Sequence, residues 1–483
     1  MPFTNGEKIV KIDIAYIVSH GFAARMVMQT NLLGKFVEKG ISVALIAPDK
    51  EDANLKKYCS EHNIQLYQFS PHSNFWSSNY ARARMYFLEN INKNPALLEK
   101  YIYAKRSSNS IALSSRIKTR IFKIGHDLKE VFPFIKTLFL KRELKMLNSH
   151  SAKELIEELN PKILVSTYPV NYSEAMLMYA AKSKGLKTVM HLLSWDNISC
   201  KGHFPILADE YIAWGPIMRD ELKEYYDVKD TNIHNTGVPH FDLHTTSKKD
   251  PQHEKYLMLQ GLDPKKPYLF FGMSSPRFAP KEIDIVEYLA SQIQNDVYGS
   301  ELQLVVRPHP QNIQGSMSDT SWLPRLEKMK NSRIAIDIPK LAKSKMPWSM
   351  EESDMYKLSH LLAGARLSLN SGSTLSIDSM MCGTPVILTS FDGDAELSYW
   401  MSARRLIDYN HLKKLTNREG VITCDSYYTL ESSIKDVLKN REAVSNTISK
   451  SVQQFCPTTG NATESVISSL ISIVEKQSKI VTA

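Results

Sequence analysis

The chain has 483 residues, of which 43% are hydrophobic and 23% are charged. Its length exceeds what one hydrophobic core usually organises, so we expect two domains, and its composition excludes wholesale disorder and a collagenous chain. The formal net charge is +9, and the five cysteines form neither a CxxC pair nor a zinc-ligand spacing, which argues against a disulfide framework.

The amino-terminal residues lack the charged-then-apolar pattern of a signal peptide. The sequence also has no run of about 18 apolar residues of the kind that crosses a bilayer. Together with the cysteine usage, these features predict a cytoplasmic protein.

Short apolar strands alternate with amphipathic helices through the first half of the chain. We expect strands at 11–19, 41–47, 162–166, 188–193, 210–213 and 233–236, and helices at 26–38, 154–159, 172–183 and 217–226. Strands separated by helices of this length imply right-handed crossovers and a mainly parallel sheet.

A basic segment interrupts this alternation. Residues 100–150 contain twelve basic and three acidic residues, a net charge equal to that of the whole chain. Apolar residues recur among them at roughly helical spacing. The pattern predicts a helical insertion at about 95–150, which is either simply solvated or a basic amphipathic surface for an anionic membrane or acceptor. We expect no nucleic-acid partner, because no nucleic-acid-binding motif accompanies the charge.

A second alternating set follows a polar stretch at 244–266, which we interpret as a linker. Its strands are expected at 268–271, 303–307, 367–370 and 385–390, and its helices at 281–294, 355–363, 374–381 and 464–476. We therefore predict an α/β protein with two Rossmann-like, doubly wound domains, at 1–243 and 267–455, that face each other across a cleft. Residues 456–483 are expected to form a helix that packs back toward the first domain.

Ligands of such sheets bind beyond the carboxyl ends of the strands, and polar residues gather at these positions. In the first domain they are His20, Asp196, Asn197 and His203, and in the second they are Gly272, Ser274, Ser275, Arg307, His309, Ser371, Ser373 and Thr374. Small hydroxyl residues before a helix, such as Ser373 and Thr374, are suited to a diphosphate. Asp378, one turn later, is placed to reach the hydroxyls of a ribose.

The loop at 307–310 reads Arg-Pro-His-Pro and follows a strong apolar strand. Its two prolines hold the loop extended, so the side chains of Arg307 and His309 project in fixed directions. Both can donate to phosphate oxygens, Arg307 as a bidentate cation and His309 as a donor and acid to a leaving phosphate.

The segment 367–388, with its core Asn-Ser-Gly-Ser-Thr-Leu-Ser-Ile-Asp-Ser-Met-Met-Cys-Gly-Thr-Pro-Val-Ile, resembles the donor-binding signature of GT-B glycosyltransferases. Arg-Pro-His-Pro resembles the His-Pro motif of bacterial GT-B enzymes that build surface polysaccharide, among them sialic acid and Kdo transferases and the related CDP-glycerol glycerophosphotransferases. Segments 194–202, 211–215 and 236–242 are similar to the amino-terminal half of such proteins.

The resemblance implies a nucleotide-activated donor bound mainly by the second domain, with Ser371, Ser373, Thr374 and His309 on its phosphate and Asp378 on its ribose. The first domain would bind a glycan or glycolipid acceptor. One departure is that Asn370 replaces the Glu that one group of retaining enzymes carries eight residues before the acid aligned with Asp378, so the stereochemical outcome stays open.

Glycosyl transfer needs a base for the acceptor hydroxyl and a stabilised leaving phosphate. We expect the base on the first domain, where His20 and Asp196 are the candidates. Trp195 beside Asp196 is expected to raise the pKa of its carboxyl.

Asn197, His203, Asp392 and Asp394 are expected to line the acceptor or donor-sugar pocket. Asp392-Gly393-Asp394 mimics the metal-binding Asp-x-Asp of GT-A enzymes, but it follows a late strand of the second domain. We therefore expect no metal, and no cofactor beside the nucleotide-activated substrate.

The first interpretation is a glycosyltransferase that extends a cell-surface glycan at the inner membrane face. Three alternatives stay open. They are a CDP-polyol phosphotransferase, a nucleotide-sugar 2-epimerase of the same fold, and a scaffold that binds nucleotide sugars without turnover.

Overall fold

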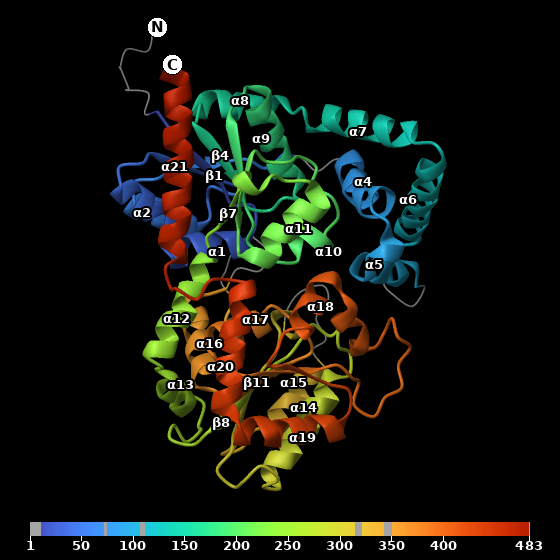
Figure 1. Cartoon of the computed structure of the whole chain (residues 1–483), viewed down its shortest axis with the longest axis vertical. Helices are drawn as coiled ribbons and strands as arrows, with labels where there is room; N and C mark the ends of the chain where they lie inside the picture. The colour runs from blue at the N-terminus through green and yellow to red at the C-terminus, as the bar shows by residue number, and fades with distance from the viewer. Residues whose placement is uncertain (1–10, 72–74, 107–111, 314–320, 342–349, 483) are drawn as a thin grey trace.

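A computed structural model describes residues 11–71, 75–106, 112–313, 321–341 and 350–482 of the chain. It contains two parallel β-sheets, each covered by helices, and Figure 1 shows the two domains stacked along the long axis of the molecule. The predicted fold class, two Rossmann-like α/β domains with a helical insertion in the first, is confirmed.

The N-terminal domain is built on a seven-stranded sheet with the order β3-β2-β1-β4-β5-β6-β7. Its strands are β1 (Ile14–Ile17), β2 (Val43–Ala47), β3 (Gln65–Gln68), β4 (Ile163–Ser166), β5 (Lys187–His191), β6 (Glu210–Ala213) and β7 (Ile233–Asn235). The central strands are buried over their whole length, because helices cover both faces of a parallel sheet.

The helices of this domain form two groups, those that pack on the sheet and those of the insertion. The first group comprises α1 (Gly21–Gln29), α2 (Leu32–Glu38), α3 (Ala53–Glu61), α8 (His150–Leu159), α9 (Tyr172–Ser183), α10 (Asn197–Cys200) and α11 (Pro216–Tyr226). The insertion comprises α4 (Phe75–Ala83), α5 (Pro95–Lys105), α6 (Leu113–Val131) and α7 (Phe134–Leu147), which Figure 1 shows to one side of the sheet.

The C-terminal domain has a six-stranded sheet with the order β10-β9-β8-β11-β12-β13. Its strands are β8 (Tyr268–Gly272), β9 (Gln303–Arg307), β10 (Ile334–Ile336), β11 (Leu367–Asn370), β12 (Val386–Thr389) and β13 (Val421–Cys424). The helices around it are α14 (Glu282–Gln294), α15 (Trp322–Met329), α16 (Glu352–Gly364), α17 (Leu375–Met381), α18 (Asn410–Thr416), α19 (Tyr427–Lys439) and α20 (Arg441–Ser451).

Two predicted elements differ from the structure. The helix expected at 26–38 is split into α1 and α2, because Asn31 adopts a left-handed backbone with φ of 48°. The linker expected at 244–266 is largely helical and forms α12 (Asp242–Lys249) and α13 (His253–Leu259). The buried residues of α12 are His244 and Ser247. Because both are polar, the sequence lacks the apolar periodicity that predicts a packed helix.

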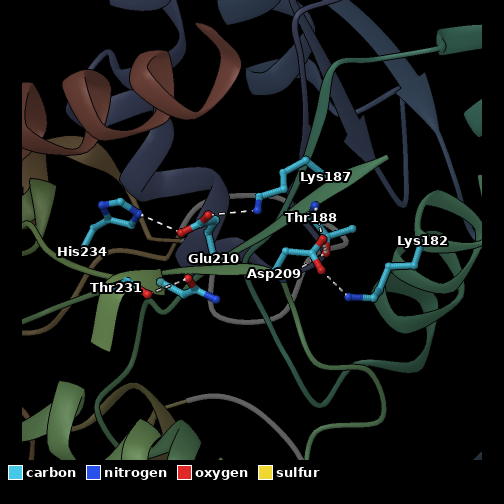
Figure 2. Close-up of polar contacts among 8 residues, drawn as sticks. Lys182, Lys187, Thr188, Asp209, Glu210, Thr231 and His234 are labelled. Atoms are coloured by element: carbon cyan, nitrogen blue, oxygen red, sulfur yellow. Dashed lines mark hydrogen bonds and ion pairs between the residues drawn. The ribbon is translucent and has the colours of Figure 1, made fainter. Parts of the chain in front are cut away.

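Charged residues at the amino ends of β5 and β6 pair with one another, as Figure 2 shows. Glu210 lies 3.0 Å from Lys187 Nζ and 3.2 Å from His234 Nε2 on the edge strand β7. Asp209 accepts hydrogen bonds from the backbone and the hydroxyl of Thr188. These contacts hold neighbouring strands together at the edge opposite the predicted ligand side.

The chain returns to the N-terminal domain through α21 (Ala462–Thr482), which Figure 1 shows beside that domain although it ends the chain. Val466, Ile467 and Leu470 are fully buried in one core with Ile14 and Tyr16 of β1. Asp242 at the start of α12 accepts hydrogen bonds from the first backbone N–H groups of α21. The segment that leaves the N-terminal domain at α12 and the segment that returns to it at α21 are thereby hydrogen-bonded to each other.

We predict that Leu470→Ala destabilises the protein by about 2–5 kcal/mol, since it removes a fully buried side chain from this core. Ile471→Ala is the matched control, because the neighbouring side chain is only partly buried. Urea unfolding measures both. Equal midpoints for the two variants would show that α21 does not pack as described.

Candidate functional site

The carboxyl ends of β8, β9, β11 and β12 lie on one edge of the C-terminal sheet, since all of these strands are parallel. Figure 1 shows α17 and α18 on the side of this domain that is turned toward the N-terminal domain. The predicted donor-site segments at 272–275, 307–309 and 371–374 all follow these strands. The topology therefore brings them to the same edge.

Asn370, the last residue of β11, organises the loop that follows. Its Oδ1 accepts hydrogen bonds from the backbone N–H groups of Gly372 at 2.9 Å and Ser373 at 3.1 Å, and from the Ser376 hydroxyl at 3.1 Å. Gly372 has a φ of 100°, which favours glycine. The loop is thus held by internal hydrogen bonds, and the half-buried Ser373 and Thr374 lie at the start of α17.

A buried carboxylate, Glu282 of α14, joins two of the strand ends. It accepts hydrogen bonds from the Ser371 hydroxyl at 2.5 Å and from the Ser274 backbone N–H at 2.6 Å. Ser371 also lies 2.9 Å from the hydroxyl of Thr389. Burial raises the pKa of Glu282 to about 7. Ser371, expected to bind phosphate, is therefore engaged in this network and positions the loop instead.

Gly272, the last residue of β8, is required for packing. A Cβ atom there would lie 1.9 Å from a terminal methyl carbon of Leu375 in α17. The glycine thus lets α17 approach the sheet closely, which is a different role from the direct donor contact that the sequence suggested.

Arg307 is committed to ion pairs within the C-terminal domain. Its guanidinium binds Asp337 beside β10 and Asp354 of α16, and both carboxylates are buried. Lys357 contacts the same Asp337 at 2.5 Å. The predicted bidentate contact from Arg307 to a phosphate is therefore not supported, because both terminal nitrogens already donate to carboxylates.

His309 has the geometry of a neutral hydrogen-bond donor. Its Nδ1 accepts the backbone N–H of Gln311 at 3.0 Å, so the proton of the neutral ring lies on Nε2. Burial lowers the pKa of His309 to about 4. Near pH 7 the ring is uncharged, so it is suited to donate to a phosphate rather than to supply an acidic proton.

Asp378, expected to bind a ribose, is already bound on one oxygen. Its Oδ1 lies 2.7 Å from Nε2 of His244 on α12, and the other ring nitrogen of His244 lies 2.8 Å from the Ser359 hydroxyl. Burial lowers the pKa of His244, but Cys382 and Asp378 outweigh it and raise the pKa to about 10. The pair ties α12 to α17.

Several buried polar groups at this edge have no hydrogen-bond partner among the described residues. They are the hydroxyl of Ser275 after β8, both amide atoms of Asn312 after β9, and the hydroxyl of Ser390 after β12. An unpaired buried polar group costs about 1–3 kcal/mol, so native proteins rarely keep several together without a role for them. Of these residues, the sequence had indicated only Ser275.

On the N-terminal domain, His20 caps α1. Its Nδ1 accepts the backbone N–H of Ala23 at 3.2 Å, and its ring packs edge-on against Tyr168. Burial, with the charges of Arg25 and Lys201, lowers the pKa of His20 to about 4. The ring is therefore neutral near pH 7, and its unprotonated nitrogen is the Nδ1 that accepts the Ala23 N–H.

Asp196 is held by an ion pair. Its carboxylate lies 2.8 Å from Lys201 Nζ and accepts the Ser194 hydroxyl at 2.6 Å. Burial raises the pKa of Asp196, but Lys201 and His411 outweigh it and leave the pKa well below its usual range. The expectation that Trp195 raises this pKa is therefore wrong. A strongly ionised, paired carboxylate is a weak base.

The remaining pocket candidates are Asn197, His203, Asp392 and Asp394, and they differ in burial and in their partners. Asn197 is buried in α10, and His203 lies 3.5 Å from Glu89. Asp392 is buried and accepts the backbone N–H of Ala403 at 3.0 Å, whereas Asp394 is exposed. No group of three His, Cys, Asp or Glu residues within the described ranges is arranged to hold a metal ion.

Arg25 of α1 is a feature that the sequence analysis missed. Its side chain is buried and lies over the Phe22 ring at 4.8 Å, and no hydrogen bond or ion pair of this guanidinium occurs among the described residues. Burial lowers its pKa to about 10, although the charges of Asp378 and Asp354 oppose that shift. Arg25 is therefore a buried cation that senses the charges of Asp378 and Asp354 in the C-terminal domain.

The insertion also reaches the C-terminal domain. Glu99 of α5 is 2% exposed and binds Arg277 at 2.8 Å, while Arg277 lies over the Tyr103 ring at 4.2 Å. A second bridge joins Cys200 Sγ to His411 Nδ1 at 2.9 Å. The two domains are thus in direct contact at both of these places.

In the described part of the chain, two of the hollows lie away from the loops that follow β8, β9, β11 and β12. One of about 680 Å³ is lined by β7 and α21, including His234 and Glu464, and none of the predicted site residues lines it. A smaller one of about 110 Å³ lies at the carboxyl ends of β1 and β2, with Ser19 and Glu174 in its wall. The smaller hollow is on the same edge as His20.

Solved structures with a similar fold include UDP-N-acetylglucosamine 2-epimerases and MnaA from S. aureus. A putative 2-epimerase from Listeria monocytogenes is 12% identical with a TM-score of 0.55 and covers 97% of each chain. The Neisseria meningitidis enzyme bound to UDP-GlcNAc is 9% identical with a TM-score of 0.54, over 95% of this chain and 100% of that one. MnaA from S. aureus, solved with UDP, is 10% identical with a TM-score of 0.53, over 96% and 97%.

At these identities the likeness establishes the two-domain fold alone. No protein-family model matches the sequence, and no curated protein sequence matches it.

We predict that stability depends on pH through Glu282. Its raised pKa stabilises the folded protein below pH 4.5, and this contribution is lost as the pH rises through about 7. The loss is on the order of 1–3 kcal/mol. The difference in unfolding free energy between the wild type and Glu282→Gln should fall between pH 5 and 8, as urea titrations at several pH values would measure. A difference that is constant with pH would contradict the described environment of Glu282.

Proposed function

We propose that this protein is a glycosyltransferase that binds a nucleotide-activated sugar between its two domains and transfers the sugar to a glycan or glycolipid acceptor. The C-terminal domain would bind the nucleotide, and the N-terminal domain would bind the acceptor. In our proposal the transfer step requires no metal ion, because a side chain of the protein supplies the positive charge that stabilises the leaving phosphate.

The observations that carry the proposal are the unpaired buried polar groups on Ser275, Asn312 and Ser390 and the buried Arg25 of the N-terminal domain. These groups lie at the edge where open α/β sheets bind ligands. A nucleotide diphosphate would satisfy them, since it accepts hydrogen bonds from hydroxyls and pairs with a guanidinium. The hydroxyls of Ser373 and Thr374 and the Nε2–H of His309 would add further donors.

Arg25 would neutralise the charge that develops on the leaving phosphate. Its burial makes this interaction stronger than the same contact in water. Because Arg25 is on one domain and Ser373 is on the other, the phosphate site would be complete only when the domains are together.

His20 is the base that we propose for the acceptor hydroxyl. Its ring is neutral near pH 7, whereas Asp196 is bound to Lys201. Nε2 would accept the proton in the tautomer that carries hydrogen on Nδ1, which gives up the cap to Ala23 during turnover. The Asp196–Lys201 pair would then keep the adjoining loop in place.

The similarity in fold to UDP-GlcNAc 2-epimerases favours one alternative, isomerisation of the donor without an acceptor. Incubation with UDP-GlcNAc alone, followed by proton NMR, separates the two functions. Conversion at the C2 centre without acceptor supports the epimerase, and conversion only with an acceptor supports the transferase.

We predict that Thr374→Ala weakens the binding of nucleoside diphosphate about tenfold, since it removes one hydrogen bond to a charged group. Thr374 makes no side-chain cap hydrogen bond, so the unfolding temperature should not change. Calorimetric titration with UDP, CDP, GDP and dTDP identifies the preferred nucleobase and measures how much affinity the variant loses. Thr447→Ala, which alters a half-buried threonine of α20, is the control. Unchanged binding of the preferred nucleotide by Thr374→Ala would contradict the proposed phosphate site.

We predict that His20→Asn abolishes most turnover while nucleotide binding is retained. Asparagine is a good helix cap, so this variant removes the base without removing the cap. A loss of at least about 100-fold in kcat is expected for a general base. Full activity of His20→Asn together with unimpaired nucleotide binding would show that His20 serves only as the cap.

A further inference from the structure

One face of α6 carries apolar side chains that remain in contact with solvent. Six of them are spaced three or four residues apart and fall within an arc of about 80° on a helix of 3.6 residues per turn. They are 47–68% exposed and comprise Leu113, Ile117, Ile121, Ile124, Leu128 and Val131, which we call the α6 stripe.

The opposite face of α6 is fixed to the rest of the insertion. Phe122 packs against a small core that contains Tyr86 and Leu97, and His126 Nδ1 lies 3.0 Å from the backbone oxygen of Phe87. Gly125 lets Phe87 approach closely. Because this face is docked, the α6 stripe points outward as a fixed feature of the domain.

The apolar surface continues across the turn into α7 with Phe132, Phe134 and Leu138, all about half exposed or more. Basic residues border it on both helices. On α6 they include Arg116 and Arg120, and on α7 they are Lys136, Lys141, Arg142 and Lys145, all four exposed. Residues 113–147 contain nine basic and three acidic side chains. The surface is thus apolar in its centre and cationic around it.

We propose that the α6 stripe and its basic border dock the protein on an anionic phospholipid membrane. The apolar side chains would enter the boundary between headgroups and acyl chains, and the bordering cations would pair with lipid phosphates. None of the helices in the described part of the chain is apolar and long enough to cross a bilayer. The contact would therefore be peripheral and reversible.

The charge and the apolar centre of this surface favour an anionic membrane over a second copy of the chain or a nucleic acid. A second copy of the chain would bring two surfaces of like charge together, which opposes association. A nucleic acid would satisfy the cations but leave six aliphatic side chains without a partner. An anionic bilayer matches both features of the surface. This inference is independent of the nucleotide site, since no residue of the α6 stripe is part of that site.

Flotation with phospholipid vesicles tests the inference. The wild type should bind vesicles of phosphatidylcholine with 30% phosphatidylglycerol at least about tenfold more tightly than vesicles of phosphatidylcholine alone. Ile121→Ser with Ile124→Ser should reduce binding about tenfold or more. Arg116→Glu with Arg120→Glu should reduce it and weaken its dependence on salt. Leu259→Ser, which alters a leucine of α13 that is more exposed than Ile121 or Ile124, is the control and should bind as the wild type does.

Three outcomes would overturn the inference. The first is equal binding by the wild type and the Ile121→Ser, Ile124→Ser variant while both remain folded by circular dichroism. The second is equal binding to neutral and anionic vesicles. The third is a dimer in sedimentation that the same double variant converts to a monomer without any vesicle binding, since the α6 stripe would then be a contact between two copies.

Discussion

Parallel pairing places the carboxyl ends of β8, β9, β11 and β12 on one edge of the C-terminal sheet, and the candidate site depends on this constraint. The buried strands have room for few polar side chains, so these gather where the strands end. Two acceptors then fix the loops. Asn370 gathers Gly372 and Ser373, and Glu282 joins Ser274 to Ser371. Because these acceptors belong to the protein itself, its own hydrogen bonds fix the conformation of the loops.

The buried cations near the domain junction also differ in whether a carboxylate of the protein pairs with them. Arg307 is enclosed by two carboxylates, and Lys201 is paired with Asp196. Arg25 differs, because it is buried beside Phe22 without an ion pair among the described residues. A buried cation without an anion is costly unless a ligand supplies one. This contrast is why we assign the phosphate to Arg25 rather than to Arg307.

The sequence was sufficient for the fold because buried parallel strands are recognisable as apolar runs. Strands such as β6, β9 and β11 occur where the pattern predicted them. The edge strand β3, Gln65–Gln68, escaped notice because half of its residues are exposed and polar. The helices of the linker were missed for a related reason, since α12 buries His244 and Ser247 in place of apolar residues.

For the site, the sequence identified the right strand ends but not which side chains are already engaged there. Arg307, Ser371 and Asp378 have the residue types that bind a nucleotide, yet each has a partner far away in the sequence, at Asp354, Glu282 and His244. Such pairings depend on tertiary contacts and leave no local pattern. Arg25 and Asn312 were overlooked because neither belongs to a motif, although Asn312 lies only two residues beyond the Arg-Pro-His-Pro loop.

The most direct test of the central claim is a crystal structure of the protein with the nucleoside diphosphate that it prefers. The account predicts that the diphosphate lies between Thr374 and Arg25, with Nε2 of His309 and the amide of Asn312 within hydrogen-bond distance of the nucleotide. A nucleotide bound elsewhere, with Arg25 and Asn312 still lacking any partner, would contradict it.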